Sequence, residues 1–151
     1  MRRQPLCLTV LAALACGAPL AAQQQPRPQA PRPEFVTGDP ALPFSQAVRV
    51  GDMIYLSGVI GDSANTVVGG GVQPETRRAM ESIRSTLEKL GSSMDDVVKC
   101  TVFLADIKEW AAMNEVYVSF FPNHRPARSA LGTTGLVRNA RVEIECLAVA
   151  R

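Results

Sequence analysis

The strongest constraint on the fold comes from two long runs in which every second side chain is apolar. In residues 97–105 the side chains on one face of an extended chain are Val98, Cys100, Val102 and Leu104. In residues 142–150 the corresponding set is Val142, Ile144, Cys146 and Ala148. A period of two residues predicts β-strands, each with one face against a core.

Two segments carry a helical pattern instead. Residues 74–90 predict a helix with apolar positions at Met80, Ile83, Leu87 and Leu90. Residues 107–121 predict a second helix, with an apolar stripe of Trp110, Met113, Tyr117 and Phe120. We interpret both stripes as core-facing, because such spacing serves packing more often than ligand binding.

Shorter strands complete the predicted order. Residues 47–50 and 53–56 read as a hairpin around Gly51-Asp52, and residues 129–134 read as a further strand. Residues 61–71 are predicted to be a flexible loop. The order β-β-α-β-α-β-β predicts an α+β two-layer domain, in which two helices cover one face of a mostly antiparallel sheet. The other face would mix apolar and charged residues, which favours a subunit interface containing a polar pocket.

The first 22 residues differ from the rest of the chain. Arg2 and Arg3 precede an uncharged segment whose apolar centre spans residues 6–14, and Ala21-Ala22 precede a polar break. This pattern predicts a secretory signal peptide at residues 1–22, cleaved after Ala22, and hence an exported protein, periplasmic or secreted. An uncleaved membrane anchor, a misassigned start codon and a lipid-modified Cys16 are the alternatives. The interrupted apolar run is unsuited to a membrane span.

Residues 23–34 are rich in proline and glutamine, which favours an extended linker. The predicted domain is therefore residues 35–151. Cleavage would leave two cysteines, Cys100 and Cys146, and strand alternation points both toward the helix layer as near neighbours. We expect buried free thiols by default; sequence leaves open whether they pair.

Composition excludes several function classes. The 16 Lys and Arg residues against 14 Asp and Glu do not indicate a strongly basic nucleic-acid binder. The single histidine, His124, is predicted to lie in an exposed loop, and the cysteines lack metal-ligand spacing. The residues left for chemistry are Arg128, which could grip a carboxylate, and Glu143, which could order a water or move a proton. A purely structural ion pair between them is the alternative.

Several short motifs, taken in the order in which they occur along the chain, form a specific pattern. They are PFSQAV at 43–48, LSG at 56–58, DVVKCTVFLAD at 96–106, MNEVY at 113–117, FFP at 120–122, PARS at 126–129 and VEIE at 142–145. Over about residues 43–151 the chain resembles the Rid family (RidA/YjgF), also described as L-PSP endoribonuclease-like. The resemblance implies a chorismate-mutase-like fold, a homotrimer with clefts between subunits, and hydrolysis of reactive enamines and imines to 2-keto acids and ammonia without metal or organic cofactor.

The same resemblance assigns site residues. Arg128 matches the arginine that holds the substrate carboxylate, and Glu143 matches the glutamate near the attacking water. Ser57 and Asn114 match other positions of the cleft. The chain departs from the family pattern at Phe44, commonly Tyr, at Val59, usually Gln, and at Ala130, often Cys, where the backbone carbonyl would still be available.

Two other functions are compatible with the same residues. One is a non-catalytic trimeric binder of small carboxylate metabolites, which would use the same Arg128. The other is a ribonuclease, for which a cluster of arginines would have to bind phosphates: Arg125, Arg128, Arg138 and Arg141. The low net charge disfavours the ribonuclease.

Overall fold

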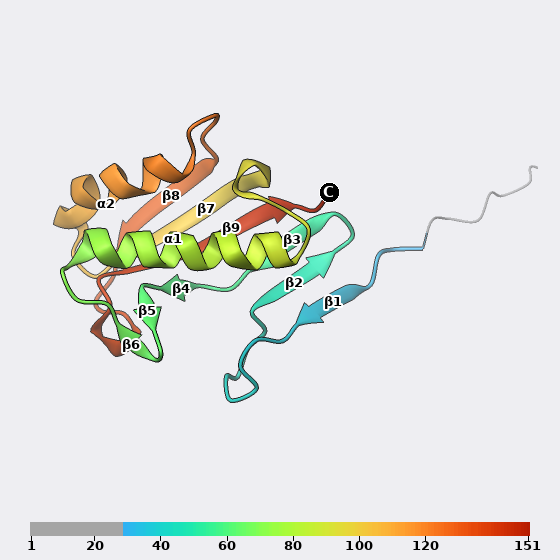
Figure 1. Ribbon diagram of the computed structural model, residues 1–151, viewed down its shortest axis with the longest axis horizontal. Helices are drawn as coiled ribbons and strands as arrows, with labels where there is room; N and C mark the ends of the chain where they lie inside the picture. Colours follow the sequence, from blue (N-terminus) through green and yellow to red (C-terminus); the bar gives the residue numbers. More distant parts are fainter. Residues whose placement is uncertain (1–28) are drawn as a thin grey trace, which may run out of the picture. The chain divides into compact units, whose positions relative to one another are not determined.

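The computed structural model describes residues 29–151, and its compact unit is Pro31–Arg151. The helices are α1 (Val72–Lys89) and α2 (Trp110–Tyr117) (Figure 1). The strands are β1 (Pro33–Val36), β2 (Ala47–Val50), β3 (Met53–Leu56), β4 (Val59–Ile60), β5 (Asp62–Ser63), β6 (Thr66–Val67), β7 (Val97–Leu104), β8 (Ala127–Gly132) and β9 (Val142–Val149).

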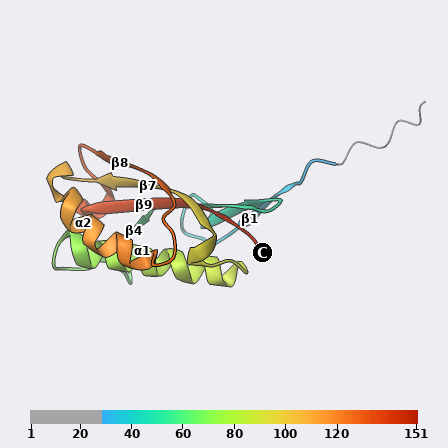
Figure 2. The same cartoon turned by 90° about the horizontal axis from the view of Figure 1, so that it is seen from above.

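The fold is built on one seven-stranded sheet. Its strand order is β1-β2-β3-β9-β7-β8, and β4 also pairs with β9. All pairings are antiparallel except β7 with β8, which run parallel because the chain crosses over through α2. Both helices lie on the same face of this sheet (Figure 2). The predicted α+β class, with two helices on one face of a mostly antiparallel sheet, is confirmed.

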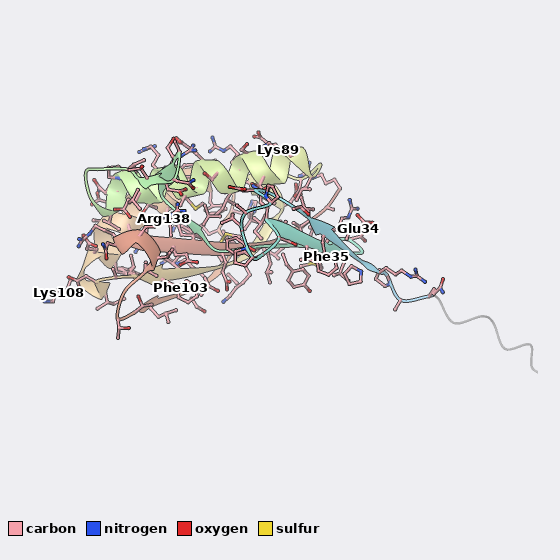
Figure 3. The ribbon with its side chains drawn as sticks, turned by 90° about the horizontal axis from the view of Figure 1, so that it is seen from below. Glu34, Phe35, Lys89, Phe103, Lys108 and Arg138 are labelled. Carbon is pink, nitrogen blue, oxygen red and sulfur yellow. A yellow bond between two sulfur atoms is a disulfide. The ribbon has the colours of Figure 1, made fainter. Side chains whose placement is uncertain are left out.

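The core lies between the helices and the sheet. Met80, Ile83 and Leu87 of α1 are completely buried, as the helical period predicts. The opposite face of the sheet is more open, and Phe103 lies there, on the side away from α1 (Figure 3). This face mixes half-buried apolar residues with Glu143 and the exposed Glu145.

Several boundaries differ from the sequence-based expectation. Helix α1 begins two residues before Pro74, β8 begins two residues before Ser129, and the predicted loop at 61–71 contains the small hairpin β5–β6. Helix α2 is shorter than predicted, because single 3-10 turns at Ile107–Glu109 and Val118–Phe120 flank it.

The predicted face assignment of β7 is wrong at its first two residues. A bulge lies between Val97 and Lys99 in the pairing with β9, and it adds one unpaired residue. Val97 therefore turns into the core at 2% exposure, whereas Val98 is 44% exposed. Alternation alone cannot reveal such an extra residue. From Cys100 onward the predicted faces are confirmed.

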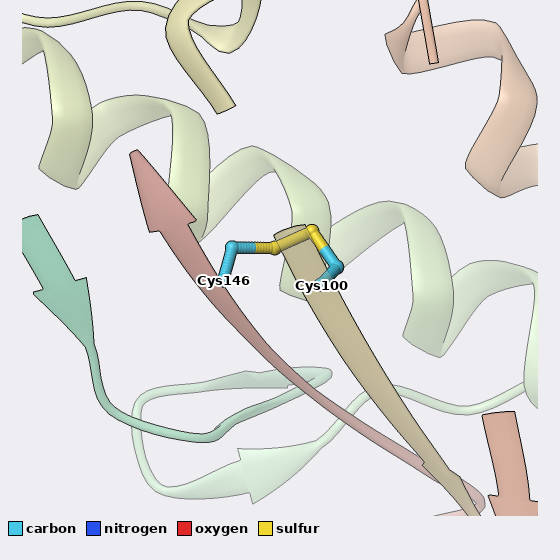
Figure 4. Close-up of a disulfide and its surroundings, with 2 residues drawn as sticks. All are labelled: Cys100 and Cys146. Atoms are coloured by element: carbon cyan, nitrogen blue, oxygen red, sulfur yellow. A yellow bond between two sulfur atoms is a disulfide. The ribbon is translucent and has the colours of Figure 1, made fainter. Parts of the chain in front are cut away.

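A disulfide joins Cys100 of β7 to Cys146 of β9. The two residues are direct partners in the strand register, and both are buried beneath α1 (Figure 4). The expected proximity and orientation are confirmed, and the default of two free thiols is wrong. Strand alternation placed both side chains on one face, but the register that sets them opposite each other is a property of the folded sheet.

The predicted signal peptide, with Cys7 and Cys16, and most of the predicted linker lie outside the described residues. Of the linker range, Pro33 and Glu34 belong to β1, where they pair with Val50 and Arg49 of β2. Within residues 29–151 no helix has both the length and the apolar character to cross a membrane.

Candidate active site

The Arg128 side chain is held by helix α2. Arg128 lies on β8 opposite Cys100, so its side chain projects toward the helices. Its Nη1 donates a hydrogen bond of 2.6 Å to Oδ1 of Asn114, and its guanidinium carbon lies 4.7 Å from the Tyr117 ring centre. Within residues 29–151 this guanidinium makes no other hydrogen bond. It is therefore oriented in advance, with N–H groups remaining for a ligand carboxylate.

Two aromatic residues complete the surroundings of this guanidinium. Trp110 lies 5.7 Å from the Arg128 guanidinium carbon and is 45% exposed, so its predicted place in the core is wrong. Tyr117 is buried, as predicted, and burial raises its pKa to about 12. Sequence reasoning missed both as site residues. The signal was their spacing of four and three residues from Asn114, which sets all three on one helix face.

Ala130 follows Arg128 by two residues and therefore projects to the same face of β8. Its side chain is partly buried and packs against the core. Because the side chain is a methyl group, it offers a ligand no polar atom. Any polar contact between a ligand and this position would have to come from the backbone.

Glu143 lies on the opposite face of the sheet. It is the second residue of β9, and it pairs with Phe103 of β7 and Ile60 of β4. Its carboxylate rests against Gly58, where any Cβ would overlap it. Partial burial raises the pKa of Glu143, and the negative charge of Glu145 adds to the effect. A carboxylate with a raised pKa is a better proton acceptor near neutral pH than an ordinary glutamate.

Ser57 directly precedes Gly58, on which the Glu143 carboxylate rests, and Phe44 precedes Ser45, the hydrogen-bond partner of Ser57. The Ser57 hydroxyl donates a hydrogen bond of 2.7 Å to the backbone carbonyl of Ser45, which leaves its oxygen as an acceptor. Phe44, next to Ser45, is 52% exposed. An exposed aromatic ring of this size is available for contact with a ligand or with another chain.

Arg128 and Glu143 do not meet within one chain. They project from opposite faces of the sheet, two strands apart and three residues apart along the strands. Their Cα atoms are therefore roughly 14 Å apart. The alternative of a structural ion pair between them is wrong, because Asn114 is the partner of Arg128. The predicted site residues thus form two groups, one around Arg128 and one around Glu143.

The remaining candidate groups carry little chemistry. His124 is exposed in its loop, as predicted, with Nδ1 3.9 Å from Oδ1 of Asp95. Arg138 and Arg141 each pair with an acidic residue, Asp62 and Glu109 respectively. In the described part of the chain, no group of three or more His, Cys, Asp or Glu side chains is arranged to hold a metal ion.

Comparison with known proteins places this architecture in a family. The family model described as Endoribonuclease L-PSP matches residues 36–150. A 2-iminobutanoate/2-iminopropanoate deaminase of Dermatophagoides farinae is 41% identical over 112 residues, which cover 73% of this chain and 88% of the relative. A RutC family protein of Pyrococcus abyssi is 40% identical over 111 residues, 72% of this chain and 87% of the relative.

Solved structures show the same fold. Yeast Mmf1 superposes with a TM-score of 0.72 at 34% identity, covering 78% of this chain and 94% of that one. The chain therefore belongs to the L-PSP family, which is the Rid (RidA/YjgF) family that its motifs resemble.

Proposed function

We propose that this protein hydrolyses reactive 2-imino and enamine acids to 2-keto acids and ammonia. The observation that carries the proposal is the Arg128 guanidinium, which Asn114 orients while other N–H groups stay available for a substrate carboxylate. The family, and relatives at about 40% identity named as imine deaminases, support the same reaction.

The reaction needs little chemical assistance from the protein. An imine carbon is already electrophilic, so catalysis consists of placing a water and moving protons. Arg128 holds the carboxylate through two parallel hydrogen bonds. Glu143 takes a proton from the water as its oxygen bonds to C2, and then returns the proton to nitrogen. The new hydroxyl group on C2 then gives up its proton, through Glu143, to the nitrogen; the C–N bond breaks, ammonia leaves and the 2-keto acid remains. An enamine follows the same steps after tautomerising to its imine. A positioned acid–base group of this kind contributes about 10²–10⁴-fold.

The proposed site takes Arg128 from one chain and Glu143 from another. The opposite projection of these two side chains supports this division, since one small substrate cannot touch both within a chain. The open sheet face supplies surface for such an assembly, because Tyr55 is 46% exposed on it. We take the assembly to be a homotrimer, as the family resemblance implies.

The Cys100–Cys146 disulfide is relevant to the compartment in which the protein works. Stable disulfides are rare in reducing compartments and common in exported proteins. The Cys100–Cys146 bond therefore supports the proposal that this protein works outside the cytosol, periplasmic or secreted. Its substrate would then be an imino acid formed or released in that compartment.

The direct test measures ammonia and 2-keto acid release from imines that an amino-acid oxidase generates in the assay. The wild-type chain is compared with Arg128→Ala and with Arg125→Ala, a control that removes an exposed arginine three residues away. We expect acceleration by wild type and the control, and a loss of roughly 10–100-fold in kcat/KM for Arg128→Ala, since hydrogen bonds to charged groups contribute about 1.5–3 kcal/mol. No acceleration by wild type over buffer contradicts the proposal.

A non-catalytic binder of small carboxylates is the second candidate. It is favoured by Phe44, which lacks the hydroxyl donor of the usual tyrosine, and by the engagement of the Ser57 hydroxyl with Ser45. Binding of 2-keto acids without any imine turnover, abolished by Arg128→Ala, would establish it. A ribonuclease has less support, because Arg138 and Arg141 already pair with carboxylates.

A further inference from the structure

Glu75 is a buried carboxylate that the proposed reaction does not use. It lies in the first turn of α1 and is 4% exposed. Burial raises its pKa, while hydrogen bonds from the backbone N–H groups of Arg141 and Val142 act in the opposite direction. A carboxylate in such a position costs desolvation energy, and it is tolerated only where hydrogen bonds satisfy it.

Its hydrogen bond fixes the backbone just before Glu143. Oε2 of Glu75 accepts from the Arg141 N–H at 2.7 Å, and Glu143 is two residues further along β9. Nε of Arg141 donates to both carboxylate oxygens of Glu109 at 2.7 Å. The backbone carbonyl of Arg141 accepts from the Ala105 N–H at 2.9 Å. The entry to β9 is therefore tied to α1, to the turn before α2 and to the end of β7.

The backbone of Glu75 contacts the second segment next to Glu143, the end of β4. Gly61 lies directly against this backbone, so close that a Cβ at Gly61 would overlap the Cα and carbonyl of Glu75. Gly61 follows β4, whose Ile60 pairs with Glu143, and β4 begins after Gly58, on which the Glu143 carboxylate rests. Glu75 thus contacts both segments that enclose Glu143, one through its carboxylate and one through its backbone.

We propose that Glu75 is a positioning residue for Glu143, which holds the start of β9 and the end of β4 together so that the Glu143 carboxylate stays in place over Gly58. The catalytic consequence rests on the proposed function. Loss of the Glu75 carboxylate would let the entry to β9 shift. A shift of about 1 Å in a catalytic group can cost about 10²-fold in rate.

Three full-length variants test this. Glu75→Ala removes the acceptor, and Glu75→Gln keeps an amide oxygen in its place. Ser92→Ala is the matched control: Ser92 is also buried, and its hydroxyl donates at 2.8 Å to the carbonyl of Val149, at the opposite end of β9. Glu75→Ala and Ser92→Ala therefore each remove one side-chain hydrogen bond at an end of β9, and Glu75→Gln retains it.

For Glu75→Ala we expect kcat to fall roughly 10–100-fold with KM within about twofold, because Arg128 is untouched. Glu75→Gln should return kcat to within about fivefold of wild type, and Ser92→Ala should leave it unchanged. A Glu75→Ala variant with full kcat, a loss carried by KM, or an equal loss in Ser92→Ala overturns the proposal.

Amide hydrogen exchange gives a readout that needs no substrate. In Glu75→Ala the amides of Ile60 and Glu143 should exchange at least about tenfold faster, while the far end of β9 stays protected. In Glu75→Gln both should remain protected. If wild type proves inactive, the proposed function fails, and exchange still decides whether Glu75 holds this segment: unchanged exchange at Ile60 and Glu143 overturns the positioning.

Discussion

Reduction of the Cys100–Cys146 disulfide should destabilise the domain by a calculable amount. The bond joins cysteines 46 residues apart in sequence. In the chain-entropy treatment, a loop of this length removes enough freedom from the unfolded chain to stabilise the fold by about 4 kcal/mol at 25 °C. Because residual structure in the unfolded state lowers such values, we expect a measured effect of about 2–4 kcal/mol.

Urea unfolding with and without a strong reductant measures this effect. With a slope near 2 kcal/mol per molar, the midpoint should fall by about 1–2 M on reduction. Protein concentration is held fixed, because association shifts apparent stability. In Cys100→Ala/Cys146→Ala the reductant should change nothing, since the other two cysteines, Cys7 and Cys16, belong to the predicted signal peptide. An unchanged wild-type midpoint, with thiol titration proving full reduction, would refute the reasoning.

Three further outcomes follow from the site. Glu145→Gln should move the acid limb of the kcat/KM profile to lower pH, because the Glu145 charge raises the pKa of Glu143 and the base must be ionised to act; a limb that stays in place in a pH series contradicts this. Asn114→Ala should raise KM by roughly 5–50-fold with little change in kcat, since the guanidinium loses a hydrogen bond of 2.6 Å. Gly58→Ala should lower kcat at least about 100-fold, whereas Gly69→Ala, with open space around it, should not; equal activities would disprove the close contact with the carboxylate.

The sequence predicted the layers of this fold well because its periodicities are strong. Alternation in residues 97–105 and 142–150 identified the two central strands, and the helical period identified α1. It failed where one extra residue changes the phase, as at Val97, and where strands are too short to show a period, as in β4 to β6. Strand β4 also depends on pairing with β9, which is distant in sequence.

The candidate site was likewise predicted only in part from the sequence. Arg128 and Glu143 were singled out by their residue type, and the family motifs added their roles and Asn114. The contacts of Arg128 with Trp110 and Tyr117 depend on how α2 packs over β8, which no local pattern specifies. The role of Glu75 is equally hidden, because its partner is a backbone N–H far along the chain.

The measurement that tests the central claim most directly is complementation between two impaired chains. Arg128→Ala still supplies Glu143, and Glu143→Gln still supplies Arg128, and each variant alone should keep at most about one tenth of the wild-type activity. If the site forms between chains, unfolding and refolding the two together should restore about one quarter of wild-type imine hydrolysis, the share of interfaces that pair two intact groups at random equal mixing. Mixed assemblies that are no more active than the single variants would contradict a shared site built from Arg128 and Glu143.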